Sequence, residues 1–60
     1  MNRHYRIYIL NSRNSVDLAY DLVFSDDVSA LLEADTFAER NAVEVWSGAR
    51  LVGQIACRRG

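Results

Sequence analysis

The sequence predicts an α+β fold of order ββαββ, with one helix packed on one face of a four-stranded, mainly antiparallel sheet. Three observations support this prediction. The first third of the chain contains two alternating apolar–polar segments, the middle has helical periodicity, and the last third has the pattern of another hairpin. A helix that crosses between two hairpins is compatible with the strand order 2-1-3-4. Residues 1–60 are expected to form a single small domain.

A first hairpin is predicted over residues 4–24. Residues 4–10 alternate between two faces, which carry Tyr5, Ile7 and Ile9 on one side and Arg6, Tyr8 and Leu10 on the other. Residues 16–24 have an apolar residue at every second position, the most regular alternation in the chain. The segment 11–15 between them is rich in residues that hydrogen-bond their own backbone and tolerate left-handed conformations. We therefore expect two strands joined by a turn.

The helix is predicted to begin at residues 25–27. Ser25 can cap free backbone N–H groups, and Asp26 and Asp27 lie at the positive end of the helix dipole. At the period of an α-helix, one apolar arc contains Val28, Leu31, Leu32, Ala38 and Ala42. We expect this arc to pack on the sheet.

The end of the helix is predicted from a change in the pattern. Asp35 interrupts the apolar arc, and Glu39 lies beside it. Thr36 and Glu39 have the spacing of a capping box, which predicts a helix break and a second short helical turn. Asn41 suits a left-handed exit toward the closing hairpin. The first helix is therefore predicted over 27–34.

A closing hairpin is predicted from the alternation on both sides of Gly48. One face is expected to carry Val43, Val45, Leu51 and Ile55, and the other Glu44, Trp46 and Gln54. In the favoured register, Gly48 is the left-handed residue of a three-residue loop and Glu44 lies opposite Arg50. In the alternative register, the loop is 47–49 and Trp46 lies opposite Arg50, where its ring can stack on the guanidinium.

Composition narrows the class of protein. The chain has one cysteine, Cys57, so an internal disulfide framework is excluded. Its longest apolar runs are three or four residues, far below the roughly 20 that cross a bilayer. The first residues also lack the apolar core of a secretion signal. We expect a cytoplasmic protein without membrane contact.

Charges are separated along the chain. The formal net charge is −1, and all seven basic residues are arginine. Residues 16–39 hold seven acidic residues and no base, whereas the flanking segments hold all the arginines. Arginines and aromatic residues together suggest an alternative function, a small single-stranded nucleic-acid-binding or regulatory protein. The residues concerned are Arg3, Arg6, Arg50, Arg58 and Arg59, with Tyr5, Tyr8 and Trp46. The acidic total and the absence of lysine argue against nucleic acid.

The sheet face that the helix leaves uncovered is the main functional candidate. It is predicted to carry aromatic and aliphatic side chains interleaved with charged ones, which is typical of partner surfaces. The candidate interface residues are Tyr8, Leu10, Val23, Trp46, Arg50 and Val52. A two-fold homodimer that pairs these faces, or pairs edge strands, would add the core that a chain of this size lacks. A different protein partner is the alternative.

No residues predict an active site. His4 is the only histidine. Asp35 and Glu39 are four residues apart, so a continuous helix would bring them together as an acid–base or cation-binding pair. A helix break, or a pairing with Arg40, is the other interpretation. Cys57 precedes two arginines, which can activate a thiol, but it also continues the inward-facing phase of the last strand. No metal-binding spacing or phosphate-binding glycine pattern occurs, so we infer no metal, cofactor, small-molecule substrate or enzyme activity.

Two segments resemble known proteins. These are YRIY at residues 5–8 and AVEVWSGARLV at residues 42–52. The chain resembles short uncharacterised proteins of alphaproteobacterial type, classed as domains of unknown function. Those proteins have a YRhYhh strand (h, apolar), an acidic helix start and a VEVWxGxRLVxxI close. The resemblance covers most of the chain and implies a small stand-alone cytoplasmic domain with no catalytic residue to transfer. The turn at 11–15 and Asp35 depart from that pattern.

Overall fold

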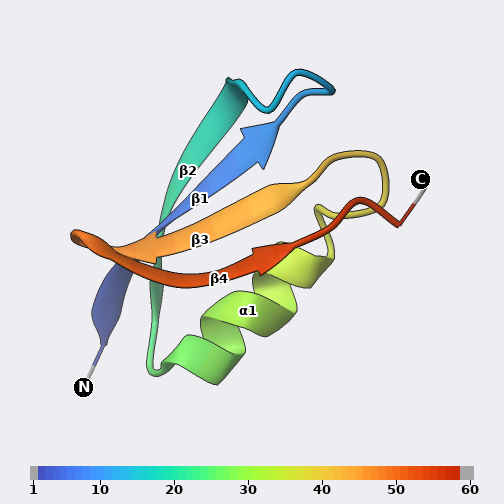
Figure 1. Ribbon diagram of the computed structural model, residues 1–60. Helices are drawn as coiled ribbons and strands as arrows, with labels where there is room; N and C mark the ends of the chain where they lie inside the picture. Colours follow the sequence, from blue (N-terminus) through green and yellow to red (C-terminus); the bar gives the residue numbers. More distant parts are fainter. Residues whose placement is uncertain (1, 59–60) are drawn as a thin grey trace.

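The computed structural model describes residues 2–58. Its elements are β1 (Arg3–Leu10), β2 (Val16–Phe24), α1 (Asp27–Asp35), β3 (Val43–Ser47) and β4 (Arg50–Ile55). The strands form one antiparallel sheet in the order β2-β1-β3-β4, and α1 lies on one face of it (Figure 1). The predicted ββαββ fold and strand order are therefore confirmed.

The core lies between α1 and the two central strands. Its buried side chains are Tyr5, Ile7, Ile9, Ala30, Ala34, Ala38, Val43 and Val45. The helix contributes only alanines to this set, and its Leu31 packs over Gly53 of β4. A Cβ atom at Gly53 would lie 2.9 Å from Leu31 Cδ2. Small residues on both elements therefore let the helix lie close to the sheet.

The helix is rotated relative to the predicted apolar arc. Ala30 faces the sheet, whereas Val28 and Leu32 are 64% and 68% exposed. The prediction that Val28 and Leu32 pack on the sheet is therefore wrong, although Leu31 and Ala38 of the same arc do contact the core. Hydrophobicity alone favours the larger side chains, but close packing of a helix on a sheet selects the side chains that fit the gap.

The helix begins at a different cap from the predicted one. Asp26, rather than Ser25, is the N-cap residue, and its carboxylate accepts a hydrogen bond from the Ser29 backbone N–H at 2.8 Å. This bond favours the charged carboxylate and lowers the pKa of Asp26. The acidic start of the helix thus contributes one cap and one first-turn charge, Asp27.

The helix ends near the predicted break. Asp35 is its last residue, Thr36 is the C-cap, and residues 36–40 form turns rather than a second helix. Asn41 does not have the positive φ that a left-handed exit requires. Its Nδ2 instead donates to the backbone carbonyl of Leu10 at 2.9 Å, which ties this segment to β1.

The turn between β1 and β2 forms where it was predicted. Asn14 has a φ of 63°, in the left-handed region. The Asn11 Oδ1 atom accepts hydrogen bonds from the backbone N–H groups of Arg13 and Ser15 at 2.8 and 3.1 Å. The Asn11 side chain therefore replaces backbone partners in the turn, as this residue type does in many loops.

A β-bulge lies at the start of β2. Ile9 pairs with Leu18, but Leu10 pairs with Val16, so Asp17 is an extra residue. The bulge moves Val16 to the face opposite Leu18, although the sequence pattern placed both on one face. The regular part of β2 therefore begins at Leu18.

The closing hairpin has neither of the two predicted registers. Gly48 and Ala49 form a two-residue turn, and Ser47 lies opposite Arg50. Gly48 has a φ of 61°, the positive value that a type II′ turn needs at its first central residue. The loops of both predicted registers were longer than this one.

A second bulge, in β4, reverses the faces on which Leu51 and Val52 were predicted to lie. Val45 pairs with Gly53 and Trp46 with Leu51, so Val52 is the extra residue. Val52 packs against the core, and Leu51 is exposed beside Trp46. The sequence pattern predicted the reverse arrangement, because one inserted residue inverts the alternation that follows it.

The molecule is elongated, with extents of 35 × 18 × 15 Å. Figure 1 shows α1 lying along β3 and β4, while the turn that joins β1 and β2 projects beyond the helix. Of the β2 side chains, only Leu22 and Phe24 are half-buried. No helix within residues 2–58 is long and apolar enough to cross a lipid bilayer.

Candidate interaction surfaces

The sheet face opposite α1 is uncovered, and we call it the open face. Strand register defines its members, since directly paired residues point to the same side. They are His4, Arg6, Tyr8, Leu10, Val16, Ala19, Asp21, Val23, Glu44, Trp46, Leu51 and Gln54. The open face is shallowly hollowed between Tyr8 and Trp46, both of which are half-buried.

Polar groups on the open face are bonded to one another. Arg6 Nε and Nη2 donate to Asp21 Oδ1 and Oδ2 at 2.8 and 3.1 Å, a bidentate pair that raises the pKa of Arg6. Glu44 accepts from Trp46 Nε1 and from Gln54 Nε2, each at 3.1 Å. These groups already have partners, so the face is a mixed polar surface rather than a set of unsatisfied charges.

The structure divides the predicted interface residues into two groups. Tyr8, Val23 and Trp46 lie on the open face, as predicted. Leu10 also points to this face, as its pairing with Val16 shows, but it is only 8% exposed. The other two lie elsewhere: Val52 packs against the core, and Arg50 reaches the helix on the other side of the sheet.

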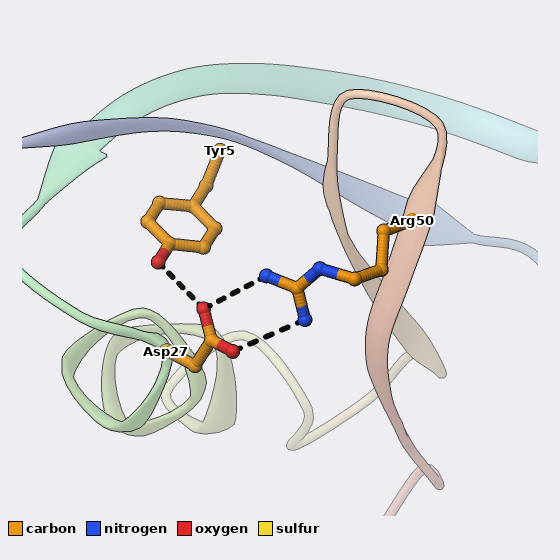
Figure 2. Close-up of polar contacts among 3 residues, drawn as sticks. All are labelled: Tyr5, Asp27 and Arg50. Atoms are coloured by element: carbon orange, nitrogen blue, oxygen red, sulfur yellow. Dashed lines mark hydrogen bonds and ion pairs between the residues drawn. The ribbon is translucent and has the colours of Figure 1, made fainter.

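Arg50 belongs to a cluster at the start of the helix (Figure 2). Asp27 Oδ1 accepts a hydrogen bond from the Tyr5 hydroxyl at 2.7 Å. Arg50 Nη1 and Nη2 donate to Asp27 Oδ2 and Oδ1 at 3.1 and 3.2 Å. The cluster therefore joins β1, α1 and β4 through one carboxylate.

These contacts shift two pKa values in opposite directions. The Arg50 guanidinium, followed by the Tyr5 hydroxyl, lowers the pKa of Asp27. The hydrogen bond to Asp27 raises the pKa of Tyr5, because a phenolate would lie against a carboxylate. The cluster was not predicted from the sequence. The residue that could have indicated it is Tyr5, which the strand pattern places on the inward face, because a buried tyrosine hydroxyl usually has a hydrogen-bond partner.

The second candidate surface is the exposed outer strand, which we call the β2 edge and define as Val16–Phe24. Its exposed apolar side chains are Val16, Leu18, Tyr20 and Val23, which are 39–54% exposed. Leu18 and Tyr20 point to the helix side of the sheet, because their partners in β1 are the core residues Ile9 and Ile7. The nine-residue helix spans about 13 Å, and it lies along the other strands, so it does not cover this part of β2.

Tyr20 of the β2 edge is held in place by an aromatic contact. Its ring stacks on that of Phe37, with centroids 5.2 Å apart and an angle of 16° between the ring planes. Phe37 follows the helix and is half-buried. This contact holds the Tyr20 ring against the molecule and leaves the rest of the strand open.

The residues considered for chemistry do not assemble into a site. Asp35 pairs with Arg58 rather than with Arg40. Cys57 is half-buried, and its Sγ atom lies 3.7 Å from the Glu39 carbonyl oxygen. Within the described part of the chain, no three histidine, cysteine or acidic side chains are grouped so that they could hold a metal ion.

The arginines that suggested nucleic-acid binding lie in different places. Arg6 is on the open face, Arg50 is at the start of the helix and Arg58 is at its end. Each of the three is paired with an aspartate. Arg59 lies outside the described residues. The paired arginines therefore form no single basic track.

Comparison of the chain with protein-family models, with curated proteins and with solved structures gives no match. The resemblance stated from the sequence motifs stays a prediction.

Proposed function

We propose that this chain is a non-enzymatic protein-interaction domain that acts as a homodimer. The observation that carries the proposal is the β2 edge, a nine-residue outer strand with exposed apolar side chains on both faces. Such strands are templates for pairing with another chain unless charges, proline or a covering element protect them. β2 contains no lysine, arginine or proline, and its two charged residues are Asp17, at the bulge, and Asp21, which is paired with Arg6.

A second copy is the partner that best fits the size of the domain. A domain of about 60 residues buries only about 60% of the surface of its unfolded chain, so its own core gives a thin margin of stability. Among residues 2–58, the largest fully buried side chains are Tyr5, Ile7, Val43 and Val45. Association of two copies would bury Leu18 and Tyr20 and enlarge this core.

We also propose that the domain works in the cytoplasm, since its single cysteine allows no internal disulfide. Single-stranded nucleic acid remains the alternative partner. The ion pairs of Arg6, Arg50 and Arg58 favour a protein partner, because a phosphate backbone would compete with three aspartates for these arginines.

The proposal is tested by a charge in the β2 edge. Leu18→Lys places an ammonium on the helix side of the strand, where the second copy would pack, and it removes little from the core of one chain. Leu32→Lys is the matched control, because Leu32 is 68% exposed on the outer side of the helix. Light scattering is expected to give the mass of a dimer for the wild type and Leu32→Lys, and the mass of a monomer for Leu18→Lys.

Circular dichroism shows whether each variant keeps its fold. A wild-type chain that stays monomeric at millimolar concentration would overturn the proposal. Dimeric Leu18→Lys with a native spectrum would exclude the β2 edge as the surface. A salt-dependent shift with single-stranded RNA, at concentrations where the chain is monomeric, would favour the alternative function.

A further inference from the structure

We infer that two copies join edge to edge through β2, with Tyr20 of each chain opposite Tyr20 of the other, in one continuous eight-stranded antiparallel sheet. This inference rests on the proposed self-association and specifies its geometry. It is carried by three observations: the difference between the two sheet edges, the spacing of the acidic residues in β2, and the two faces of that strand.

The two edges of the sheet are protected to different extents. β4 has six residues, a bulge at Val52, and an arginine at its first position that is held by Asp27. The chain after β4 also returns to the turns that follow the helix, where the Arg58 backbone N–H donates to the Ala38 carbonyl at 2.9 Å. β2 has nine residues and no such cover, and its bulge lies near one end, at Asp17. Edge pairing is therefore expected at β2.

The acidic residues of β2 select among the symmetric registers. A pairing centred on Asp21 would put the two Asp21 carboxylates directly opposite each other. A pairing centred on Ala19 would put Asp17 opposite Asp21 of the second copy. Like charges in these positions are destabilising. Pairings centred on Leu18 or Leu22 avoid these contacts but would pair only five residues of each strand. Tyr20 is the middle residue of β2, so the pairing centred on it uses all nine residues; Asp21 then faces Ala19 and Asp17 faces Val23, so each acid has a neutral partner.

The faces of β2 exclude the intermediate registers. A shift by one residue would set Tyr20 or Leu18 opposite Asp21 of the second copy and mix the apolar and polar faces. The Tyr20-centred pairing keeps them apart and places Leu18 opposite Leu22. Both helices then lie on the same side of the eight-stranded sheet, and the exposed Leu18 and Tyr20 side chains of both copies are brought together between them.

Cysteine cross-linking tests this register without altering Tyr20. Ala19 and Asp21 are exposed on the open face, so Ala19→Cys and Asp21→Cys, each combined with Cys57→Ser, leave the core intact. Directly opposed residues have Cα atoms about 4.5–5.5 Å apart, within the range of a disulfide. Diagonal neighbours are about 7–8 Å apart and cannot be bridged without backbone movement.

The two variants are mixed in equal amounts and oxidised with glutathione disulfide, and the linked species are separated by mass spectrometry. The mixed A19C–D21C species is expected to exceed each homodimeric species at least several-fold. Predominant A19C–A19C linkage, which forms with Asp17 and Asp21 both in place, would overturn the register and leave the proposed function standing. A dimer by light scattering that gives no cross-link would overturn the Tyr20-centred pairing. A wild-type monomer would overturn the proposed function itself.

Discussion

At the scale of single residues, Asp27 connects three elements of the fold. Its carboxylate binds a buried tyrosine hydroxyl from β1 and a guanidinium from β4, and it lies in the first turn of α1. The Asp27 and Arg50 side chains are 37% and 54% exposed, so solvent screens their attraction. The contribution of this cluster is therefore expected to lie in orientation of the helix as much as in stability.

Asp27→Asn is predicted to flatten the dependence of stability on pH. The pKa of Asp27 is lower in the folded chain than its ordinary value of about 4, so the stabilisation is complete above that value. It is lost as the pH falls through the lower, folded value. The variant should be less stable than the wild type at pH 7, with a smaller difference at pH 2–3.

Urea unfolding at several pH values measures this effect. Asp26 also has a lowered pKa, so some dependence on pH should remain in the variant. Tyr5→Phe is the partial control, because it removes one of the three hydrogen bonds to the Asp27 carboxylate and should raise the pKa of Asp27 toward its ordinary value. Equal slopes of stability against pH for wild type and Asp27→Asn would contradict the assigned role.

At the scale of elements, the contact between α1 and β4 depends on the absence of a side chain. A Cβ atom at residue 53 would come within 2.9 Å of Leu31 Cδ2. Gly53 does not have a positive φ, so space rather than backbone conformation explains the glycine. A larger residue at position 53 would therefore displace the Leu31 side chain.

Gly53→Ala is predicted to lower the free energy of unfolding by about 1 kcal/mol. Overpacking costs about 1–3 kcal/mol, whereas the reduced entropy of the unfolded chain returns about 0.4–1 kcal/mol. In a Leu31→Ala background the clash is absent, so Gly53→Ala should be neutral or slightly stabilising. A double-mutant cycle by chemical denaturation gives the coupling; additive effects would mean that the two residues do not compete for space.

Periodicity was sufficient to predict the elements, because each strand and the helix extends over several repeats of its pattern. It was not sufficient to predict which face of the sheet a side chain points to beyond a bulge. Asp17 and Val52 are single inserted residues, and nothing in their side chains distinguishes them from paired strand residues. The positions of Val16, Leu51 and Val52 were therefore predicted on the wrong face.

The bulges also explain why only some residues of the candidate surfaces were predicted correctly. Tyr8 and Trp46 precede any bulge in their strands and lie on the open face as expected. The exposure of β2 was not predicted, because it depends on where the helix lies over the sheet. That position follows from the alanines of α1 and from Gly53, a packing property that hydrophobic patterning does not contain.

At the scale of the whole molecule, folding brings part of the acidic segment against the arginines of its flanks. The acidic middle segment and the arginine-containing ends are joined by three ion pairs, Arg6–Asp21, Arg50–Asp27 and Arg58–Asp35. Each pair links one flanking segment to the middle one. The charge separation seen along the chain is therefore a feature of the fold as well as of composition.

The melting temperature is predicted to rise with protein concentration. If folding and association are one transition, a hundred-fold increase in concentration adds about 2.7 kcal/mol per dimer. With an unfolding entropy of about 2.1 cal/mol/K per residue, this corresponds to a shift of about 10 °C. Leu18→Lys should melt at one temperature at all concentrations. Scanning calorimetry measures both chains, and a concentration-independent wild type would argue for a stable monomer.

Trp46 gives the molecule a built-in optical reporter. It is the only tryptophan in the chain, and its indole sits half-buried on β3, separated from β2 by β1. Joining along β2 leaves the water around this indole unchanged, so its fluorescence maximum should hold steady on dilution. Stacking of two sheets through their open faces would bury the indole and shift its emission to shorter wavelengths. A dilution series would therefore distinguish the two geometries without any label.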